Sequence, residues 1–317
     1  MKPSLLITRP LPAAVMEAAR DRFDVTARES GQPLSDDELR AALRDHDAVL
    51  PTLGDRFQPA VFAAVFAPRA RILANFGVGY NHIDVAAARA AGIVVTNTPG
   101  AVTEATADIA LTLILMTARR AGEGERLVRA GRWEGWHPVQ MLGMHLGGRT
   151  LGVIGMGRIG RAIARRAHLG FGMEVVFFNR SSLADAGVPA RQVDLATALG
   201  ADVVVVAVPG GRETHHLIDA GALARMKPHA ILVNIARGDV VDEAALVEAL
   251  RQGRIAGAGL DVYEFEPEVP EALRAMENVT LLPHLGTAAL EVRTAMGMMA
   301  LENLAAFFEG REPPNRV

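Results

Sequence analysis

The chain has 317 residues, of which half are hydrophobic and 22% are charged, and its net charge is −3. This balance is typical of globular proteins, and the length favours two domains. The weakly acidic charge gives no reason to expect nucleic acid binding, and the lack of cysteine excludes disulfides and thiolate nucleophiles and argues against a structural zinc site.

The first third of the chain alternates short β-branched runs with segments of helical period. Strands are predicted at 5–8, 23–27, 47–51, 71–76 and 93–97. The apolar run at 4–8 is too short for a secretory signal, and the most apolar segment, 109–118, is about half the length needed to cross a bilayer. We therefore expect a cytoplasmic protein without a membrane span.

Residues 102–131 predict one long helix, with Thr103 as its N-cap and Gly131 as its stop. A second set of strands follows at 150–155, 175–179, 202–208, 230–236, 255–262 and 279–284. These runs are mostly continuous and apolar, as expected for parallel strands covered on both faces, and six of them make a complete dinucleotide-binding sheet. A final helix near 289–309 is not needed for that sheet, so it could pack back on the first domain.

The segment GMGRIG carries Gly155, Gly157 and Gly160 between a predicted strand and a predicted helix. In this context the glycines allow a tight turn and let the backbone approach a pyrophosphate at the helix N-terminus. Arg158 and Arg161 fall in the first helical turn, where a cation is disfavoured unless an anion binds nearby. The pattern predicts a dinucleotide site.

Residues 177–182, FFNRSS, place Asn179 where an NAD-binding fold usually has an acid that holds the ribose. Three interpretations are open: a different cofactor, a lost cofactor site, or a plain turn. Asn179 removes a charge that would repel a 2′-phosphate, Arg180 supplies one that attracts it, and Ser181 and Ser182 add hydroxyl donors. We therefore predict NADP(H) in preference to NAD(H).

Further polar residues follow the strands of this second domain. Arginine can hold a carboxylate bidentately, and histidine can exchange a proton near neutral pH, so Arg237 and His284 are candidates for catalysis. His215 and His216, which also follow a strand, compete with His284 for that role. Spacing alone does not choose among four nearby acids, Asp261, Glu264, Glu266 and Glu268.

Several ordered motifs resemble those of the D-isomer-specific 2-hydroxyacid dehydrogenases. They are GMGRIG (155–160), NIARGDVVDEAAL (234–246), GAGLDVYEFEPE (257–268) and PHLGTAA (283–289), together with NFGVGYNHID (75–84) and VTEATADIAL (102–111). The resemblance covers essentially the whole chain, and residues 131–155 look like the glyoxylate/hydroxypyruvate reductase branch.

The resemblance implies an α/β fold with two parallel-sheet domains joined by a hinge. Residues 99–287 would form an NADP-binding Rossmann domain, and residues 1–98 with 288–317 a discontinuous, flavodoxin-like substrate domain. The family triad maps onto Arg237 as the substrate anchor, Glu266 as the acid that orients the histidine, and His284 as the proton donor. Glu266 is chosen because the family acid lies five positions after the strand aspartate, here Asp261.

The same resemblance assigns the remaining site residues. Cofactor-binding positions are Thr106, Gly155, Met156, Gly157, Arg158, Ile159, Gly160, Asn179, Arg180, Ser181, Val208, Pro209, Thr214, Ile235, Ala236, Arg237, Asp261, His284 and Gly286. Substrate-binding positions are Leu53, Val78, Gly79, Arg237, His284 and, from a partner subunit of a homodimer, Trp136, for which ordinary interface packing is the alternative. The loop 209–211 reads Pro-Gly-Gly where many members have Pro-Leu-Thr, which leaves backbone contacts there open.

The expected activity is NADPH-dependent reduction of glyoxylate and hydroxypyruvate to glycolate and D-glycerate, without a metal. Larger 2-oxo acids such as aryl pyruvates are the alternative substrates. From another class of protein, a corepressor-like nucleotide sensor shares this scaffold.

Overall fold

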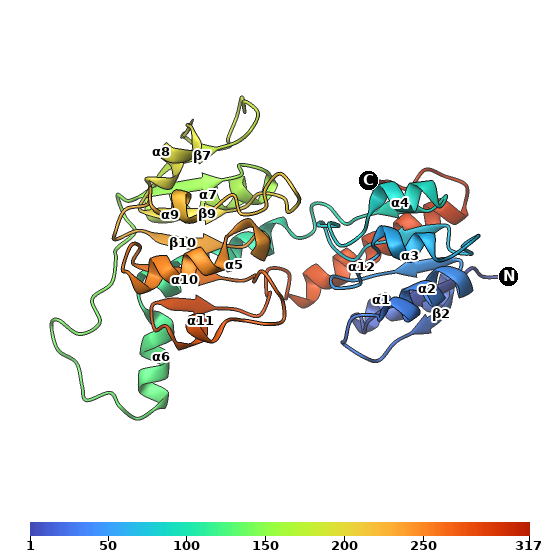
Figure 1. Cartoon of the computed structure of the whole chain (residues 1–317), viewed down its shortest axis with the longest axis horizontal. Coiled ribbons are helices and arrows are strands. Elements are labelled where there is room, and N and C mark those ends of the chain that lie inside the picture. The colour runs from blue at the N-terminus through green and yellow to red at the C-terminus, as the bar shows by residue number, and fades with distance from the viewer. The chain divides into compact units, whose positions relative to one another are not determined.

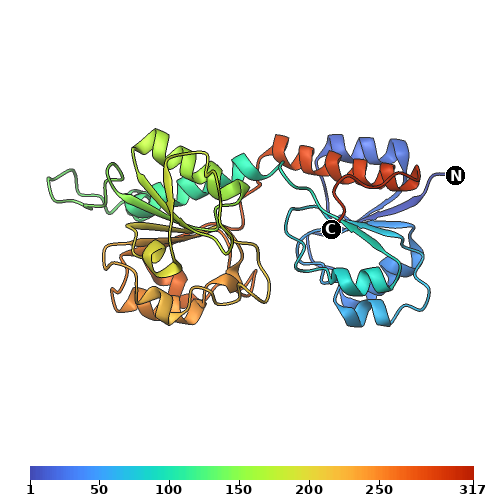
Figure 2. The same ribbon diagram turned by 90° about the horizontal axis from the view of Figure 1, so that it is seen from above.

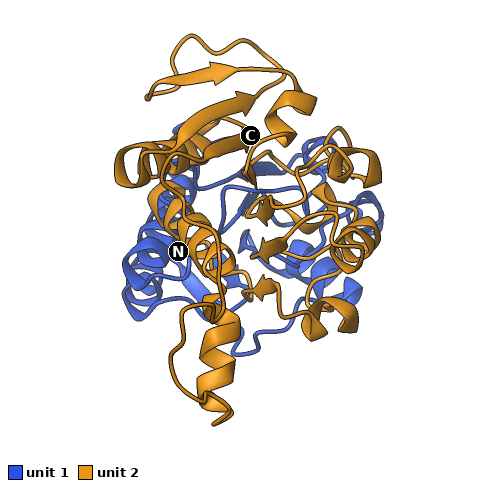
Figure 3. Ribbon diagram, turned by 90° about the vertical axis from the view of Figure 1, so that its left-hand side faces the viewer, with its two compact units in different colours: residues 1–102, 287–317 blue, residues 103–286 orange.

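The structure is a computed structural model that describes all 317 residues. Two compact units are distinguished (Figure 3): residues 1–102 with 287–317, and residues 103–286. No helix is long and apolar enough to cross a membrane.

Unit 1 contains a parallel sheet of five strands in the order β2-β1-β3-β4-β5, which is the flavodoxin-like order. Its elements are β1 (Ser4–Ile7), α1 (Ala13–Arg22), β2 (Asp24–Ala27), α2 (Asp36–Asp45), β3 (Ala48–Leu50), α3 (Pro59–Ala63), β4 (Ile72–Ala74), α4 (Val85–Ala90), β5 (Val94–Thr96) and α12 (Leu290–Phe308). All five strands and the final helix were predicted from the sequence.

Helices cover both faces of this sheet (Figures 1 and 2). Leu5 and Ile7 of β1 point into one core with α1 and α12, whereas Leu6 points into the other core with α2, α3 and α4. Alternate side chains of one strand therefore enter opposite cores, as the two-residue period of a strand requires. The last helix belongs to unit 1 although it follows unit 2 in the chain.

Unit 2 contains a parallel sheet of seven strands in the order β12-β11-β10-β9-β6-β7-β8. Its elements are α5 (Thr103–Ala118), α6 (Ala121–Arg129), β6 (Thr150–Ile154), α7 (Arg158–Phe171), β7 (Glu174–Phe178), β8 (Ala190–Gln192), α8 (Leu195–Leu199), β9 (Val203–Val206), α9 (Ala220–Leu223), β10 (Ile231–Asn234), a 3₁₀ turn (Gly238–Val240), α10 (Glu243–Arg251), β11 (Gly257–Leu260), α11 (Glu271–Ala275) and β12 (Val279–Leu281).

This topology confirms the predicted α/β fold class and corrects the strand count. The six strands β8-β7-β6-β9-β10-β11 reproduce the Rossmann order 3-2-1-4-5-6, and β12 is a seventh strand beyond them. The sequence prediction included β12 but missed β8, a three-residue strand of sequence ARQ that pairs only with β7. Such a short, polar edge strand carries little hydrophobic signal.

The prediction of one helix over 102–131 was wrong. Arg120 adopts a left-handed conformation, with a φ of 54°, and separates α5 from α6. The carbonyl of Ala118 accepts a hydrogen bond from the backbone N–H of Met144 at 2.7 Å, so the returning chain caps the end of α5. Gly143 permits this approach, because a Cβ there would lie 2.4 Å from the Ala118 oxygen.

Candidate active site

Arg237 lies just beyond the carboxyl end of β10, in a turn that Asn234 shapes. The Asn234 side chain accepts a hydrogen bond from the backbone N–H of Ala236 at 3.0 Å and donates one to the carbonyl of Arg237 at 2.9 Å. The next residue, Gly238, lies against the peptide that joins Tyr263 and Glu264, since a Cβ there would meet the Tyr263 carbonyl carbon at 1.8 Å. The arginine turn and the acid-bearing segment after β11 are therefore in direct backbone contact.

Glu266 and His284 form the next part of the site. The His284 Nδ1 lies 2.9 Å from the Glu266 Oε2, and the other Glu266 oxygen accepts the backbone N–H of Tyr263 at 3.1 Å. His284 has a φ of 55°, unusual for a residue other than glycine. With Nδ1 engaged by a carboxylate, Nε2 is the ring nitrogen that can exchange a proton with a ligand.

The electrostatics of these groups follow from burial and mutual contact. Burial by itself raises the pKa of Glu266. This effect is outweighed by the hydrogen bond and charge of His284, by the Tyr263 N–H and by the charge of Arg237, so the pKa of Glu266 lies below its usual range. Burial lowers the pKa of Arg237, opposed by the carboxylates of Glu266 and Asp239. An arginine guanidinium stays charged in proteins and carries donors only, so Arg237 can act as an anchor for an anion.

Asp261 holds the turn that follows His284. Its buried carboxylate accepts the backbone N–H groups of Leu285 at 2.6 Å and Gly286 at 2.8 Å, and its own carbonyl accepts the N–H of His284 at 3.0 Å. Burial is the main cause that raises the pKa of Asp261, against the opposing effect of these donors. From α5, the Thr106 hydroxyl donates to the Gly286 carbonyl at 3.1 Å.

The glycine turn has the shape that a pyrophosphate needs. Gly155 has a φ of 103° and a Cβ there would lie 2.8 Å from the Ala207 backbone, while at Gly160 it would lie 2.2 Å from the Gly155 oxygen. A Cβ at Gly157 would meet nothing within 4 Å, and no side chain caps the α7 N-terminus that begins at Arg158. Open space before uncapped N–H groups fits an anionic group.

The residues after β7 divide into two roles. The Asn179 Oδ1 accepts the backbone N–H of Met156 at 2.7 Å, so this side chain ties the glycine turn to β7. Arg180 is exposed and forms an ion pair with Glu213 of the loop after β9. Ser181 and Ser182 are also exposed.

The predicted cofactor-binding residues of the loop after β9 differ from one another in exposure and in hydrogen-bond partners. Val208 is half-buried and Pro209 is exposed, and the Thr214 hydroxyl bonds the Pro209 carbonyl at 2.7 Å within the loop itself. His216, a competitor for the catalytic role, pairs its Nε2 with the Glu264 Oε1 at 2.8 Å. Its neighbour His215 is exposed.

In unit 1, Val78 and Gly79 lie in a loop whose carbonyls accept hydrogen bonds from two buried asparagines. The Asn97 Nδ2 donates to the Val78 carbonyl at 2.9 Å, and the Asn75 Nδ2 donates to the Gly79 carbonyl at 3.0 Å. The backbone N–H groups of Val78 and Gly79 donate no hydrogen bond within the chain. Leu53 is 37% exposed.

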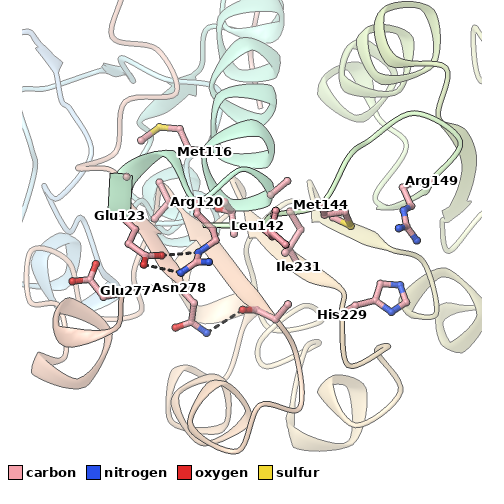
Figure 4. Close-up of a pocket in the computed structure, with 16 residues that line it drawn as sticks. Met116, Arg120, Glu123, Leu142, Met144, Arg149, His229, Ile231, Glu277 and Asn278 are labelled. Atoms are coloured by element: carbon pink, nitrogen blue, oxygen red, sulfur yellow. Dashed lines mark hydrogen bonds and ion pairs between the residues drawn. The ribbon is translucent and has the colours of Figure 1, made fainter. Parts of the chain in front are cut away.

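A cavity of unit 2 is lined by other residues (Figure 4). It measures 740 Å³ and is lined at the amino ends of the strands by residues such as Ile231 and Thr280, and by Met116, Arg120 and Leu142. Within it Arg120 pairs with Glu123. Because Arg237, Glu266 and His284 follow the carboxyl ends of the same parallel strands, this cavity is not part of their site.

Comparison with known proteins decides the family. Residues 111–286 match the family described as "D-isomer specific 2-hydroxyacid dehydrogenase, NAD binding domain". The chain belongs to the D-isomer-specific 2-hydroxyacid dehydrogenases. It is therefore an oxidoreductase whose unit 2 carries a domain for a nicotinamide dinucleotide, as the sequence motifs predicted.

Similar D-2-hydroxyacid dehydrogenases place the chain in the glyoxylate reductase branch. The glyoxylate reductase of Pyrococcus furiosus is 45% identical and that of Thermococcus onnurineus 44%, each over all of this chain and 96% of the relative. Among solved structures, an NADPH-dependent glyoxylate/hydroxypyruvate reductase from Sinorhizobium meliloti, in complex with NADP and malonate, matches with a TM-score of 0.89 and 38% identity. That match covers 100% of this chain and 97% of the other.

Two contributors to this dehydrogenase site were missed from the sequence. Asn234 ends an apolar run and shapes the arginine turn, and an asparagine at the end of a buried strand was the available signal. The pairing of His216 with Glu264 depends on residues 48 positions apart, which no local pattern reveals.

Gly238 gives a test of the contact between the two turns. We expect Gly238→Ala to lower kcat at least tenfold with little change in dinucleotide affinity, because its Cβ displaces the segment that carries Glu266. Steady-state kinetics and fluorescence titration of the cofactor measure the two effects. Gly170→Ala, where a Cβ meets nothing within 4 Å, is the matched control. Equal kcat for the two variants would contradict the expectation.

Proposed function

We propose that this protein reduces small 2-oxo acids, glyoxylate and hydroxypyruvate, to glycolate and D-glycerate with NADPH. The observation that carries the proposal is the Glu266–His284 pair, 2.9 Å apart, beside Arg237 at the carboxyl edge of a dinucleotide-binding sheet. The names of the similar proteins support the substrate class. Residues 99–287 would be the cofactor domain, and residues 1–98 with 288–317 the substrate domain.

In this proposal the residues of the triad divide the work of binding and proton transfer. Arg237 binds the substrate carboxylate and polarises the carbonyl, which its charge and fork of donors allow. Glu266 orients His284 through Nδ1, and His284 delivers the proton from Nε2 to the carbonyl oxygen. The chemistry that the bound cofactor supplies is hydride transfer to the carbonyl carbon.

Further contacts complete the proposed site. The glycine turn with Met156, Arg158 and Ile159 would hold the pyrophosphate, while Val208, Pro209, Thr214, Ile235 and Ala236 would line the cofactor, and Thr106, Asp261 and Gly286 would support its nicotinamide end. The unused N–H groups of Val78 and Gly79 are suited to a carboxylate, and Leu53 would bound the substrate.

NADPH preference is proposed from Arg180. The guanidinium is exposed after β7, beside a strand end where an acid would select NAD, and its present partner Glu213 is equally exposed. A 2′-phosphate would compete with Glu213 for Arg180.

A homodimer is proposed from α6 and the following segment. No residue of α6 is buried, and residues 132–142 expose Trp133, Trp136, Val139 and Leu142. Several large exposed apolar side chains in one segment are typical of a surface that a second subunit covers. Trp136 would then bound the substrate site of the partner. The cytoplasmic location stays a prediction.

The activity is tested with NADPH and NADH against glyoxylate, hydroxypyruvate and phenylpyruvate. We expect the two small acids to be reduced with NADPH, His284→Asn to abolish turnover with cofactor binding intact, and Arg237→Ala to raise KM for the acid and lose most of kcat. Preference for phenylpyruvate would identify a reductase of larger acids. Binding of the dinucleotide without any turnover would indicate a sensor.

Cofactor choice is tested at Arg180 and Glu213. Arg180→Ala should raise KM for NADPH roughly tenfold or more and leave KM for NADH unchanged, because a charged hydrogen bond to the 2′-phosphate is lost. Glu213→Gln should lower KM for NADPH, since it removes a competing carboxylate. Initial rates at low salt measure both variants, and equal effects on the two cofactors would disprove the role of Arg180.

The subunit contribution is tested at Trp136. We expect Trp136→Ala to raise KM for glyoxylate several-fold while KM for NADPH and the dimeric sedimentation coefficient stay unchanged. Trp133→Ala, three residues earlier and also exposed, is the control. A monomeric wild-type protein in sedimentation velocity would refute the proposal.

A further inference from the structure

Unit 2 contains two histidine–glutamate pairs whose glutamates, Glu264 and Glu266, are close in sequence. Glu266 pairs with His284, and Glu264, two residues earlier, pairs with His216 through a 2.8 Å contact between Glu264 Oε1 and His216 Nε2. Both histidines have positive φ angles, 49° for His216 and 55° for His284. A non-glycine residue in this region is strained and persists only where its surroundings fix it.

His216 contacts two other segments that carry the site. Its backbone N–H donates to the carbonyl of Asp239 at 2.8 Å, in the 3₁₀ turn that follows Arg237. Its Nδ1 lies 3.9 Å from the Asp242 Oδ2. The Ile218 bridge to Val241 continues this pairing, so the loop after β9 is fixed to the arginine turn.

Glu264 is fixed on its other side as well. The backbone N–H of Glu264 donates to the Glu243 carboxylate, and the backbone N–H of Glu243 donates to the Glu264 carboxylate, each at 3.4 Å. Only 13% of the Glu264 side chain is exposed. The Tyr263–Glu264 peptide lies against Gly238, and the Tyr263 N–H holds Glu266. A shift of Glu264 would therefore move the backbone that carries Glu266.

We propose that His216 is a positioning residue, which clamps the segment 263–266 against the Arg237 turn and thereby sets the geometry of Glu266 and His284 for the reaction. This inference rests on the proposed function, since it assigns a role in that turnover. The two ring nitrogens of His216 face the carboxylates of Glu264 and Asp242, so its effect is on the placement of the triad.

The clamp has a defined pH dependence. The hydrogen bond to Glu264 raises the pKa of His216, against partial burial, and the charges of Glu264, Asp242 and Asp239 add to it; the remaining titratable neighbour is the stacked ring of His215. A raised folded-state pKa means that the charged clamp is complete below the unfolded value of 6.5 and weakens as pH rises through the folded value.

The test compares three variants of the full-length protein with NADPH and glyoxylate. His216→Ala should lower kcat roughly tenfold or more, because small displacements of catalytic groups have effects of this size. His216→Gln, whose amide can donate at the position of Nε2, should restore most of kcat. His215→Ala, which removes the neighbouring exposed ring, should behave as wild type.

The pH profile separates positioning from a purely structural role. Wild-type kcat should fall more steeply above neutral pH than that of His216→Gln, because the glutamine amide does not titrate. If His216→Ala retains kcat within twofold of His215→Ala and loses only thermal stability, the inference is overturned. Lack of any turnover in the wild type would instead refute the proposed function.

Discussion

The contact between Gly238 and the Tyr263–Glu264 peptide is the constraint on which the rest of the site depends. Only a residue without a side chain fits there, because a Cβ would overlap the Tyr263 carbonyl. Through this contact two loops that follow neighbouring strands, β10 and β11, are held as one body. Arg237 enters from one loop and Glu266 from the other, so their separation is set by backbone packing and not by flexible side chains.

Hydrogen bonds to the main chain hold the turn that carries His284. The Asp261 carboxylate accepts two consecutive N–H groups, and Thr106 binds the Gly286 carbonyl, so the turn after β12 has little freedom. The left-handed backbone of His284 is then fixed by these hydrogen bonds. A general acid needs a ring held in one orientation, and here the main chain and Glu266 provide it together.

The features that could be predicted from sequence are those with a local signal. Apolar runs identified nearly all strands, and the glycine spacing located the turn before α7, because close backbone packing admits no other residue there. The strand β8 was missed because its three residues are polar, and the end of α5 was missed because it depends on Met144 binding Ala118. The hydrogen bond by which Asn179 ties Met156 to β7 was not predicted either, because it joins two residues that are distant in sequence.

The alternation of Glu264 and Glu266 also bears on how this protein can vary through evolution. One exposed residue, Phe265, separates two carboxylates that serve different histidines. A single insertion or deletion between Asp261 and Glu264 would move both glutamates out of register with their histidines. Selection should therefore remove changes of length from this short stretch, whatever the substitutions around it.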